Sequence, residues 1–407
     1  MIKKEHYFII GGGSLQLEFL RCVKENGFIT HCFDYDPNCI CKNECDFFHL
    51  ISIGEKEKIL ELAKFYNIVG IGTTATELGN ITVCYVGQNL GLATNSYETA
   101  LNTTDKSRMK KIFTKFNIPT ANYIEISNET EFEELLNKMG GGGITEFPLV
   151  VKPSDRSAGR GVKKVNNISE LKIAYKVAKS FATNGIVLIE EVLKGKQFSV
   201  ETISSNKEHK IVAITEEYLR KGYYKNDFLE TQQLIPARIS KARHQDIEYQ
   251  IIKILDAFEI KFGACHIELK LDINGVKIIE IASRMGGWRN VLVKNSYDID
   301  YNHLLLKASL GRKLDDIKCD AKNFCLVKII FTQKDYNFYL HVKQRYPQMI
   351  INDNVFITNE TKFDYSSDLL DAKGYYYIKI PSTDNPSKFI KGIITESNPK
   401  ITAKSSH

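Results

Sequence analysis

The sequence lacks the features that mark membrane and secreted proteins. No apolar run among its 407 residues approaches the roughly 20 residues needed to cross a bilayer. The polar start, Met1 to His6, leads into only a short apolar stretch and then glycines, which does not fit a secretory signal. We therefore expect a cytoplasmic protein that has no membrane partner.

Long basic tracts and a disulfide framework are also missing. The net charge of +6 is mild, and no basic run carries interleaved aromatic residues, so we expect no nucleic-acid partner. The nine cysteines are an odd number spread along the chain, which favours free thiols. Cys39, Cys41 and Cys45 lie close together, but their spacing matches no common zinc pattern, and free thiols are the better interpretation.

What the sequence does contain is an alternation of strands and helices. Hydrophobic periodicity predicts the order β-α-β-α-β over residues 7–72, which is typical of a parallel, doubly wound sheet. Caps predict a helix from Ser127 to Met139, ended by the run Gly140 to Gly143. From about Gly311 the pattern becomes β-rich and aromatic. The sequence therefore predicts an α/β protein with a small C-terminal domain.

A triglycine segment, Gly11 to Gly13, follows the first expected strand and opens a helix, where free backbone N–H groups can bind an anion. The dinucleotide fingerprint G-x-G-x-x-G is incomplete, because Gln16 stands where its last glycine would fall. Asp34 and Asp36 end the second expected strand, where an acid that binds ribose would lie. On the residues alone, a weak NAD site and a tight packing turn both stay open.

A second glycine-bearing segment carries cations. Lys152 ends an apolar strand, and the loop from Ser154 to Gly161 adds two arginines and two glycines. Such a loop can bind a triphosphate, because glycines permit close approach and cations meet the oxygens. The Walker pattern G-x4-G-K-[ST] is absent, which excludes a P-loop NTPase. A solvated basic hairpin is the alternative interpretation.

An apolar strand from Ile186 to Ile189 leads into Glu190 and Glu191 and then into Val192 and Leu193. Backbone groups of such a segment can bind the edge of an adenine ring, while apolar side chains cover its faces. An ordinary strand end fits the same pattern equally well.

Two glutamates lie on strands that flank Asn274-Gly275, the strongest short hairpin signal. If these strands pair, Glu268 and Glu280 lie nearly opposite one another. Two carboxylates at that distance repel each other unless a cation lies between them, and Mg²⁺ prefers carboxylate and phosphate oxygens together. Arg284 follows shortly afterwards and could stabilise charge on a transferring phosphoryl group.

Taken in order, these segments resemble the ATP-grasp superfamily, in particular its carboxylate–amine ligases. The similarity includes bacterial L-amino-acid ligases and, more distantly, biotin carboxylase and D-alanine–D-alanine ligase. The resemblance implies an α/β ATP-grasp fold, in which a catalytic α+β lobe binds ATP. The implied parts are a Rossmann-like N-terminal domain (1–103), a central lid subdomain (104–192), the catalytic lobe (193–312) and a small β-rich C-terminal domain (313–407).

The resemblance also implies roles by position. Lys152 and Arg284 would be catalytic, and Glu268 and Glu280 would bind Mg²⁺, with Mn²⁺ as a substitute. The residues that would bind ATP are Lys106 and Lys152 at the phosphates, Ser157, Gly159 and Gly161 in a flap, Glu190, Glu191 and Leu193 at the adenine, and Gln197 near the ribose. Gln197 departs from the acid that the family often has there, and Ala282 departs from a frequent asparagine, which puts ATP affinity and metal binding in doubt.

The implied function is an ATP-dependent ligase that forms an amide bond through an acyl phosphate and releases ADP and phosphate, with an amino acid as one substrate. Candidate substrate contacts are Ser14, Gln16, Glu230, Trp288 and Arg289. Two alternatives stay open, namely a kinase that stops at a phosphorylated product and a non-catalytic nucleotide-binding regulator. Relatives are often dimers, so the resemblance leaves a homodimer open, although nothing in the sequence itself shows an interface.

Overall fold

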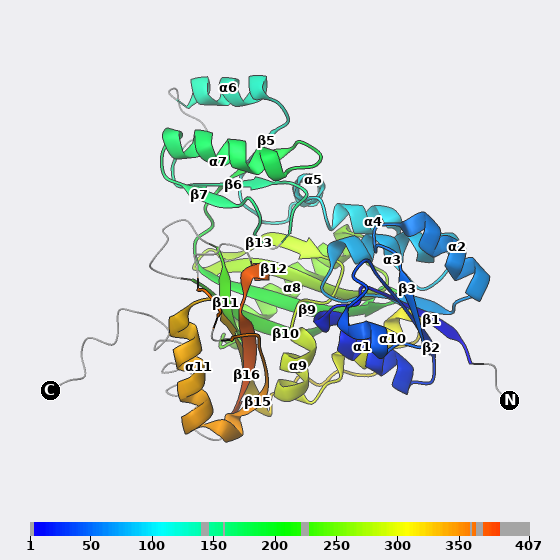
Figure 1. The fold of residues 1–407 in the computed structure, drawn as a ribbon. Coiled ribbons are helices and arrows are strands. Elements are labelled where there is room, and N and C mark those ends of the chain that lie inside the picture. Colours follow the sequence, from blue (N-terminus) through cyan, green and yellow to red (C-terminus); the bar gives the residue numbers. More distant parts are fainter. Residues whose placement is uncertain are drawn as a thin grey trace.

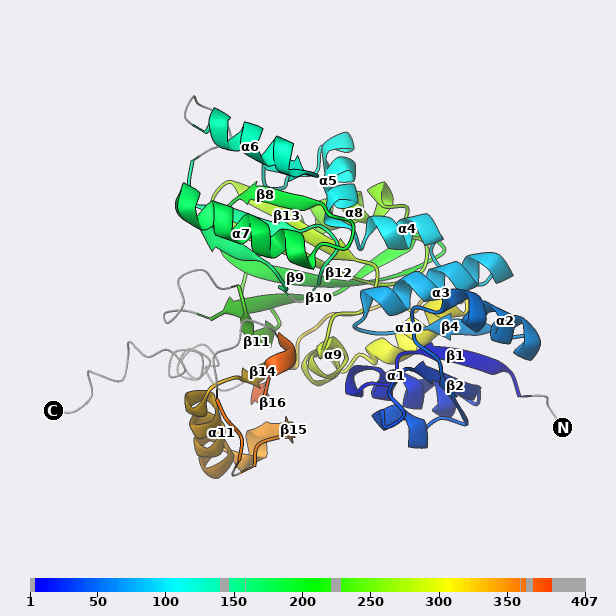
Figure 2. The ribbon, with the colours of Figure 1, turned by 45° about the horizontal axis from the view of Figure 1, so that its top comes forward.

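The computed structural model describes residues 4–139, 146–157, 159–220, 228–358, 360–363 and 369–382. Three β-sheets organise this part of the chain. Figures 1 and 2 show a long central sheet, an N-terminal sheet at one side of it, and a small lid sheet above it. In the described part of the chain, no helix combines the length and the apolarity that crossing a membrane requires.

The N-terminal sheet is parallel, as the sequence predicts, with the strand order β3-β2-β1-β4. Its strands are β1 (His6–Ile10), β2 (Ile29–Asp34), β3 (Phe47–Leu50) and β4 (Gly70–Gly72), and its helical segments are α1 (Ser14–Glu25), η1 (Ile40–Asn43), α2 (Lys56–Tyr66) and α3 (Glu77–Leu90). Phe8, Ile9 and Ile10 are fully buried, because helices cover both faces of a parallel sheet.

The lid sheet is antiparallel and has its own core. Its strands, in the order β5-β8-β6-β7, are β5 (Tyr123–Ile126), β8 (Val187–Glu191), β6 (Leu149–Pro153) and β7 (Lys163–Val165). The helices α6 (Glu129–Lys138) and α7 (Ile168–Phe181) pack on it, and Phe132 stacks on Tyr175 at a ring distance of 3.8 Å. The helices α4 (Tyr97–Asn102) and α5 (Lys106–Lys115) connect the N-terminal sheet to the lid.

The start of α6 corrects one expectation. Asn128, and not Ser127, is the N-cap, since its side chain accepts a hydrogen bond from Glu131 N at 3.0 Å. The expected stop at Gly140 to Gly143 lies outside the described residues.

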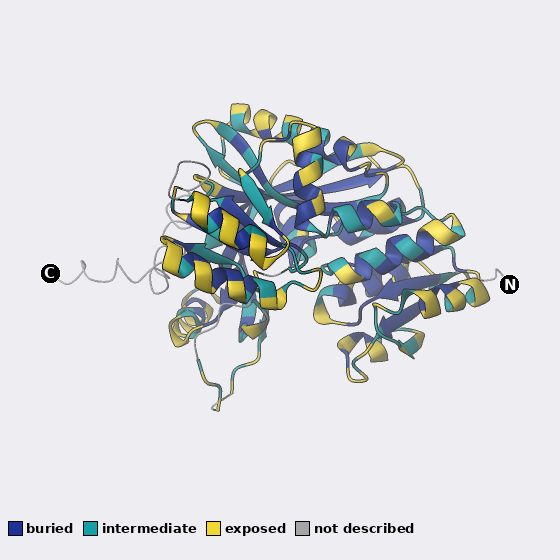
Figure 3. Cartoon of the chain, turned by 90° about the horizontal axis from the view of Figure 1, so that it is seen from above, coloured by how far each residue is buried: buried dark blue, intermediate teal, exposed yellow. Residues whose placement is uncertain are grey.

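The central sheet has eight antiparallel strands in the order β13-β12-β9-β10-β11-β14-β16-β15. They are β9 (Lys196–Ser205), β10 (Glu208–Leu219), β11 (Glu230–Ile235), β12 (Gly263–Asp272), β13 (Gly275–Ala282), β14 (Asn323–Ile330), β15 (Ile350–Val355) and β16 (Gly374–Pro381). The helical segments are α8 (Lys241–Ala257), α9 (Arg289–Tyr297), α10 (Tyr301–Ser309), α11 (Gln333–Arg345), η2 (Pro347–Met349) and η3 (Leu369–Asp371). Figure 3 shows the strands buried beneath helices whose outer faces are exposed.

The C-terminal strands extend the central sheet. β14 pairs with β11, and β16 and β15 follow it in the same sheet. The expected domain boundary at residue 313 therefore falls within a single sheet. This segment is β-rich, as expected, but it also contains the 13-residue helix α11.

Backbone hydrogen bonds join the three sheets at one place. Ile278 N in β13 donates to Pro119 O at 2.7 Å, ahead of the lid strand β5. Lys106 N at the start of α5 donates to Ser154 O at 2.8 Å, directly after β6. Ala75 N, just before α3, donates to Met285 O at 3.1 Å. The starts of α3 and α5, the end of β6 and the β12–β13 hairpin therefore meet in one region.

Candidate active site

Two glutamates form a pair in this region. β12 and β13 make the predicted hairpin, and its register sets Glu268 opposite Glu280. Asp272 pairs with Gly275, so a regular ladder from that turn would set Glu268 opposite Ile279. An extra residue in β13 makes a β-bulge between these two points and moves Glu280 into place. Bulges beside active sites commonly re-aim a side chain in this way.

Lysines from α5 and β6 reach the carboxylates around this pair. Lys106 Nζ lies 3.0 Å from Glu280 Oε2. Lys152 Nζ lies 2.9 Å from Glu190 Oε1 on β8, and Lys110 Nζ lies 3.3 Å from the same oxygen. Burial alone would raise the pKa of the Glu190 carboxyl, but the two lysines hold it below its usual value. Burial lowers the pKa of Lys110 to about 8, even beside that carboxylate.

Arg284 bridges the central sheet and the N-terminal domain. Its Nε donates to Oε1 of Glu77 at 3.0 Å, and its Nη2 binds the same oxygen. Glu77 is the first residue of α3, where the helix dipole also favours a negative charge. Burial would raise the pKa of the Glu77 carboxyl, but the guanidinium outweighs it and lowers this pKa to about 2.

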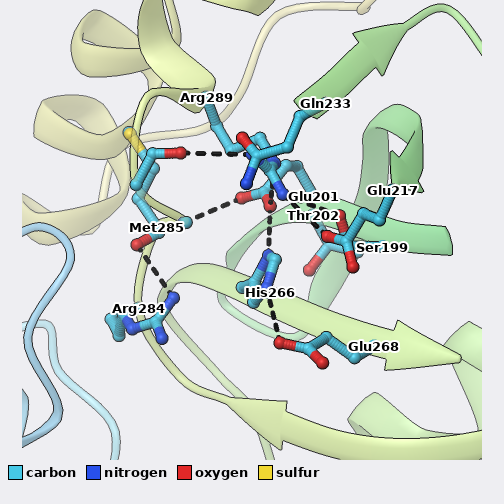
Figure 4. Close-up of polar contacts among 12 residues, drawn as sticks. Ser199, Glu201, Thr202, Glu217, Gln233, His266, Glu268, Arg284, Met285 and Arg289 are labelled. Atoms are coloured by element: carbon cyan, nitrogen blue, oxygen red, sulfur yellow. Dashed lines mark hydrogen bonds and ion pairs between the residues drawn. The ribbon is translucent and has the colours of Figure 1, made fainter. Parts of the chain in front are cut away.

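A series of charged contacts leads from Glu268 through His266 and Glu201 to Arg289 (Figure 4). Glu201 Oε1 on β9 lies 2.5 Å from His266 Nδ1, and His266 Nε2 lies 3.4 Å from Glu268 Oε1. Arg289 lies at the other end of this series, with its Nε 3.3 Å from Glu201 and its Nη2 2.8 Å from Glu217. Burial would lower the pKa of His266, but Glu201 and Glu268 raise it to about 10. Figure 4 shows these side chains converging from β9, β10, β12 and α9.

Three carboxylates converge beside this series of contacts. Oxygen atoms of Glu217, Glu230 and Glu268 all lie within 4.8 Å of one another, a spacing that could hold a cation. Gln197 Nε2 donates to Glu217 Oε2 at 2.9 Å and to Glu230 Oε1 at 3.2 Å. Burial raises the pKa of Glu230 well above its usual value, and the charge of Glu217 adds to that effect. Among the residues that the structure describes, this is the one group with the spacing of a multidentate metal site.

Comparison with known proteins identifies the fold that holds these residues. Residues 145–291 match the family model described as an ATP-grasp domain. This segment is an ATP-grasp domain. The match covers the second half of the lid and the β12–β13 hairpin, and so includes Lys152, Glu190, Glu268, Glu280 and Arg284.

Relatives of this chain include D-alanine–D-alanine ligases and carbamoyl phosphate synthases. D-alanine–D-alanine ligase from Flavobacterium psychrophilum is 32% identical over 152 residues, which are 36% of this chain and 44% of that relative. The match thus spans less than half the length of that relative.

Solved structures cover more of the chain. L-amino acid ligase from Bacillus licheniformis has a TM-score of 0.76 at 19% identity, over 97% of this chain and 98% of that one. N5-carboxyaminoimidazole synthetase from Staphylococcus aureus, complexed with ADP, has a TM-score of 0.76 at 16% identity, over 97% of each chain. The chain therefore has the predicted ATP-grasp fold.

The ATP-grasp lid carries the residues expected around the nucleotide. Gly159 and Gly161 have φ angles of 73° and 75°, which glycine adopts readily. Ser157 Oγ accepts a hydrogen bond from Arg160 Nη2 at 3.3 Å. The roles of these residues at ATP stay predictions.

At the end of β8, the two expected adenine residues have different surroundings. Glu191 Oε1 lies 2.9 Å from Lys277 Nζ of β13, so it joins the lid to the central sheet. Leu193 is half-buried directly after β8. The predicted contacts of both residues with adenine stay predictions.

Several residues expected at the substrate already have partners within the chain. Gln16 Oε1 accepts from Gly13 N at 3.0 Å, and Gln16 Nε2 donates to Thr74 O at 2.5 Å. Arg289 is 1% exposed and binds Glu201 and Glu217, so a contact with a substrate carboxylate would require it to leave them.

Trp288 is also buried, and its ring packs edge-on against Tyr375 at 5.5 Å. Ser14 is exposed at the start of α1. The triglycine segment itself is a turn tied to β2, because Gly12 N donates to Asp34 Oδ2 at 2.7 Å. Asp34 is one of the two acids that the NAD interpretation assigns to a ribose, and here it already accepts a hydrogen bond from the turn.

Sequence reasoning missed four charged residues of the site. Glu77, Glu201 and Glu217 carry no motif, and their partners lie 207, 65 and 72 residues away along the chain. Lys110 did leave a signal, because it follows Lys106 by four residues and therefore lies on the same face of α5.

Proposed function

We propose that this ATP-grasp chain is an ATP-dependent carboxylate–amine ligase that forms an amide bond through an acyl phosphate and releases ADP and phosphate. One observation carries the proposal. Lys106 and Glu280 meet at 3.0 Å, beside the Glu268–Glu280 pair and below the lid. Cations and paired carboxylates at one point are what a triphosphate with its metal ion requires.

The lysines support a binding site for phosphate. Lys110 and Lys152 share one carboxylate, Glu190, so two buried positive charges meet one negative charge. Burying a charge without a full partner is costly, and a phosphate group would supply the second negative charge. Lys106 would reach the same phosphates by leaving Glu280.

The paired glutamates fit a divalent cation. Burial raises the pKa of the Glu268 carboxyl, and the charge of Glu280 adds to that effect. The two side chains therefore repel each other across the hairpin, and a cation between them would remove the repulsion. Mg²⁺, or Mn²⁺ in its place, would be held by Glu268 and Glu280 and would neutralise charge on the phosphate oxygens.

Arg284 would serve the transfer itself. Its buried guanidinium is held by Glu77 and interacts with Glu280, so a positive charge is fixed beside the phosphates. In the first step a substrate carboxylate oxygen bonds to the γ-phosphorus as the bond to ADP breaks. In the second step an amine nitrogen bonds to the acyl carbon as phosphate leaves. The flap containing Ser157 to Gly161 would exclude water, which would otherwise hydrolyse the acyl phosphate.

An amino acid is the proposed class of one substrate. Oxygens of Glu217, Glu230 and Glu268 lie within 4.8 Å of one another, and an ammonium group among them would favour the ionised forms of the carboxyls whose pKa values their mutual proximity raises. Gln197 already donates to two of these carboxylates, so an ammonium group would replace or join an existing amide donor.

The test is ADP and phosphate release from Mg·ATP, with and without a pool of amino acids and small carboxylates. We expect release that depends on the pool and that Lys152→Ala and Glu280→Gln each reduce by on the order of a hundredfold or more. Matched controls are Lys176→Ala on the exposed face of α7 and Glu61→Gln on the exposed face of α2, which should leave the rate unchanged.

Other products would point elsewhere. AMP and pyrophosphate in place of ADP and phosphate would contradict the acyl-phosphate route. ADP release without an amine, with a stable phosphorylated product, would identify a kinase. ATP binding with no stimulated release from any pool would favour a nucleotide-binding regulator.

A further inference from the structure

Three histidines form a hydrogen-bonded row on the N-terminal sheet. They are His6 on β1, His31 on β2 and His49 on β3. The Nδ1 atom of His6 lies 2.8 Å from Nε2 of His31, and Nδ1 of His31 lies 2.9 Å from Nε2 of His49. The middle ring therefore has a histidine partner at each of its two nitrogens.

The register of the sheet places these rings together. Side chains alternate between the two faces of a strand, so residues two positions apart share a face. His31 pairs with Phe8 of β1 on one side and with Phe47 of β3 on the other. His6 precedes Phe8 by two residues, and His49 follows Phe47 by two. All three imidazoles therefore lie on the same face of three neighbouring strands.

Aromatic rings enclose the middle histidine. His31 is fully buried, Phe47 stacks on it at a ring distance of 4.7 Å, and the ring of Tyr66 at the end of α2 lies 4.3 Å away. His6 and His49 are half-buried. The two end rings therefore exchange protons with solvent directly, whereas the middle ring is shielded.

The bonds of the histidine row limit how many protons it can hold. Each bond between two rings takes one proton, shared by two facing nitrogens, and one further nitrogen is left at each end of the row. The intact row therefore has room for four protons, and three neutral imidazoles already carry three. It accepts one more, but another would set two N–H groups face to face and break a bond.

We propose that the histidine row is a pH-sensitive switch that holds the edge strand β3 on the N-terminal sheet and releases it when the row must take up a second proton. Within the described part of the chain, β3 is four residues long and pairs with β2 alone. The contact between His31 and His49 adds a side-chain link between these two strands. Once the rings separate, each can be protonated at both nitrogens, so release takes up two or three protons.

The surroundings of the row oppose added protons. Burial and the charges of His49 and His6 lower the pKa of His31 to about 3, whereas Asp46 acts in the opposite direction. Burial lowers the pKa of His49 as well. On the side of α2, the row faces the phenol ring of Tyr66. Because the folded pKa of His31 lies below the usual 6.5, protons favour the released state, and the switch weakens as the pH falls below 6.5.

Three histidines also suggest a metal site, but their geometry differs from one. Among the described residues, the group with the spacing of a three-ligand site is Glu217, Glu230 and Glu268. The row instead joins its end rings to opposite nitrogens of the middle ring, which a series of hydrogen bonds requires.

The test is native-state hydrogen exchange of the full chain, read by mass spectrometry between pH 7 and about pH 4.5. After correction for the intrinsic exchange rate, protection of the β3 amides reports the release equilibrium. We expect this protection to fall by on the order of a hundredfold or more per pH unit below about pH 5.5, because release takes up at least two protons. The amides of α7, which belongs to the separate core of the lid, should keep their protection over the same range.

Two variants separate the row from general acid sensitivity. His6→Asn removes one ring but keeps the link to β3, so release should take up one proton fewer and the pH dependence should weaken by on the order of tenfold per unit. His49→Asn removes the link itself, so protection of β3 should become nearly independent of pH. His341→Asn, at an exposed position on α11, is the matched control and should behave as wild type.

Three results would overturn the proposal. The first is a fall in wild-type β3 protection of tenfold or less per pH unit, which would mean that fewer than two protons are taken up. The second is an unchanged pH dependence in His6→Asn or His49→Asn. The third is an equal loss of protection in α7, which would show that acid opens the whole chain and not the edge strand.

Discussion

Replacing Glu77 with glutamine tests how firmly the N-terminal domain holds Arg284. The pKa of the Glu77 carboxyl is about 2, against 4.5 in the absence of the fold, because Arg284 outweighs the effect of burial. At about 1.4 kcal/mol per pKa unit, the folded state gains about 3 kcal/mol from this ionised carboxylate at neutral pH. The side chain is 20% exposed, so little solvent screening applies. We therefore expect Glu77→Gln to lower the free energy of unfolding by about 3 kcal/mol at pH 7.

The sign of the pH dependence gives a sharper test. The carboxyl has a depressed pKa in the folded state, so its contribution is present above pH 4.5 and is lost as the pH falls towards 2. The difference between wild type and Glu77→Gln should hold at pH 5 and narrow by about 1.4 kcal/mol at pH 3.5.

Urea titration followed by the fluorescence of Trp288, the sole tryptophan, measures unfolding beside Arg284. Glu98→Gln is the matched control, because Glu98 binds Arg108 on the surface and should change stability by about 0.5 kcal/mol or less. A Glu77 difference below about 1 kcal/mol, or one that does not narrow in acid, would refute the reasoning.

Three further perturbations follow from other contacts. Gln197→Glu would exchange two donated hydrogen bonds for a third carboxylate beside Glu217 and Glu230, so we expect a loss of about 2–4 kcal/mol in urea titration that Mn²⁺ partly restores. Lys110 has a folded pKa of about 8, below its unfolded value of 10.5, so the stability of wild type relative to Lys110→Met should rise by about 3 kcal/mol between pH 7 and pH 10.5. Asp105→Ala removes the N-cap of α5, so thermal unfolding should show a loss of about 1–2 kcal/mol, and an unchanged transition would contradict that role.

The sequence predicts those parts of the site that are local. The Asn274-Gly275 signal and two flanking strands are sufficient to pair Glu268 with Glu280, because a hairpin relates residues that lie close in the chain. The bulge that completes the pairing could not be predicted, since it depends on how β12 and β13 also pack on β9 and α8. Lys152 is recognisable for a similar reason, as it ends a strand beside a glycine-bearing loop.

Contacts between distant segments could not be predicted from patterns of neighbouring residues. Arg284 is recognisable as a cation near the phosphates, but nothing near it in the sequence indicates Glu77, 207 residues earlier. Arg289 shows that the sequence also conceals when a charged residue is already paired. Its charge suggests a contact with substrate, but Glu201 and Glu217, on strands that fold beneath it, already bind it.

The helix α11 is a different case, because its start does carry a local signal. Thr332 and Asp335 form a capping box, which the β-rich and aromatic composition of the surrounding segment masked.

The pairing of β14 with β11 bears on how this protein can be shortened for experiments. A fragment that ends after α10 would look complete, because every proposed nucleotide and metal residue precedes that point. It would nevertheless leave β11 with an unpaired edge, directly beside Glu230 and Gln233. Such an open edge invites pairing between molecules, so the fragment should aggregate and should also lose the arrangement of Glu217, Glu230 and Glu268. The strands β14, β16 and β15 therefore cover this edge of the central sheet, and a shortened version that is to stay monomeric must retain them.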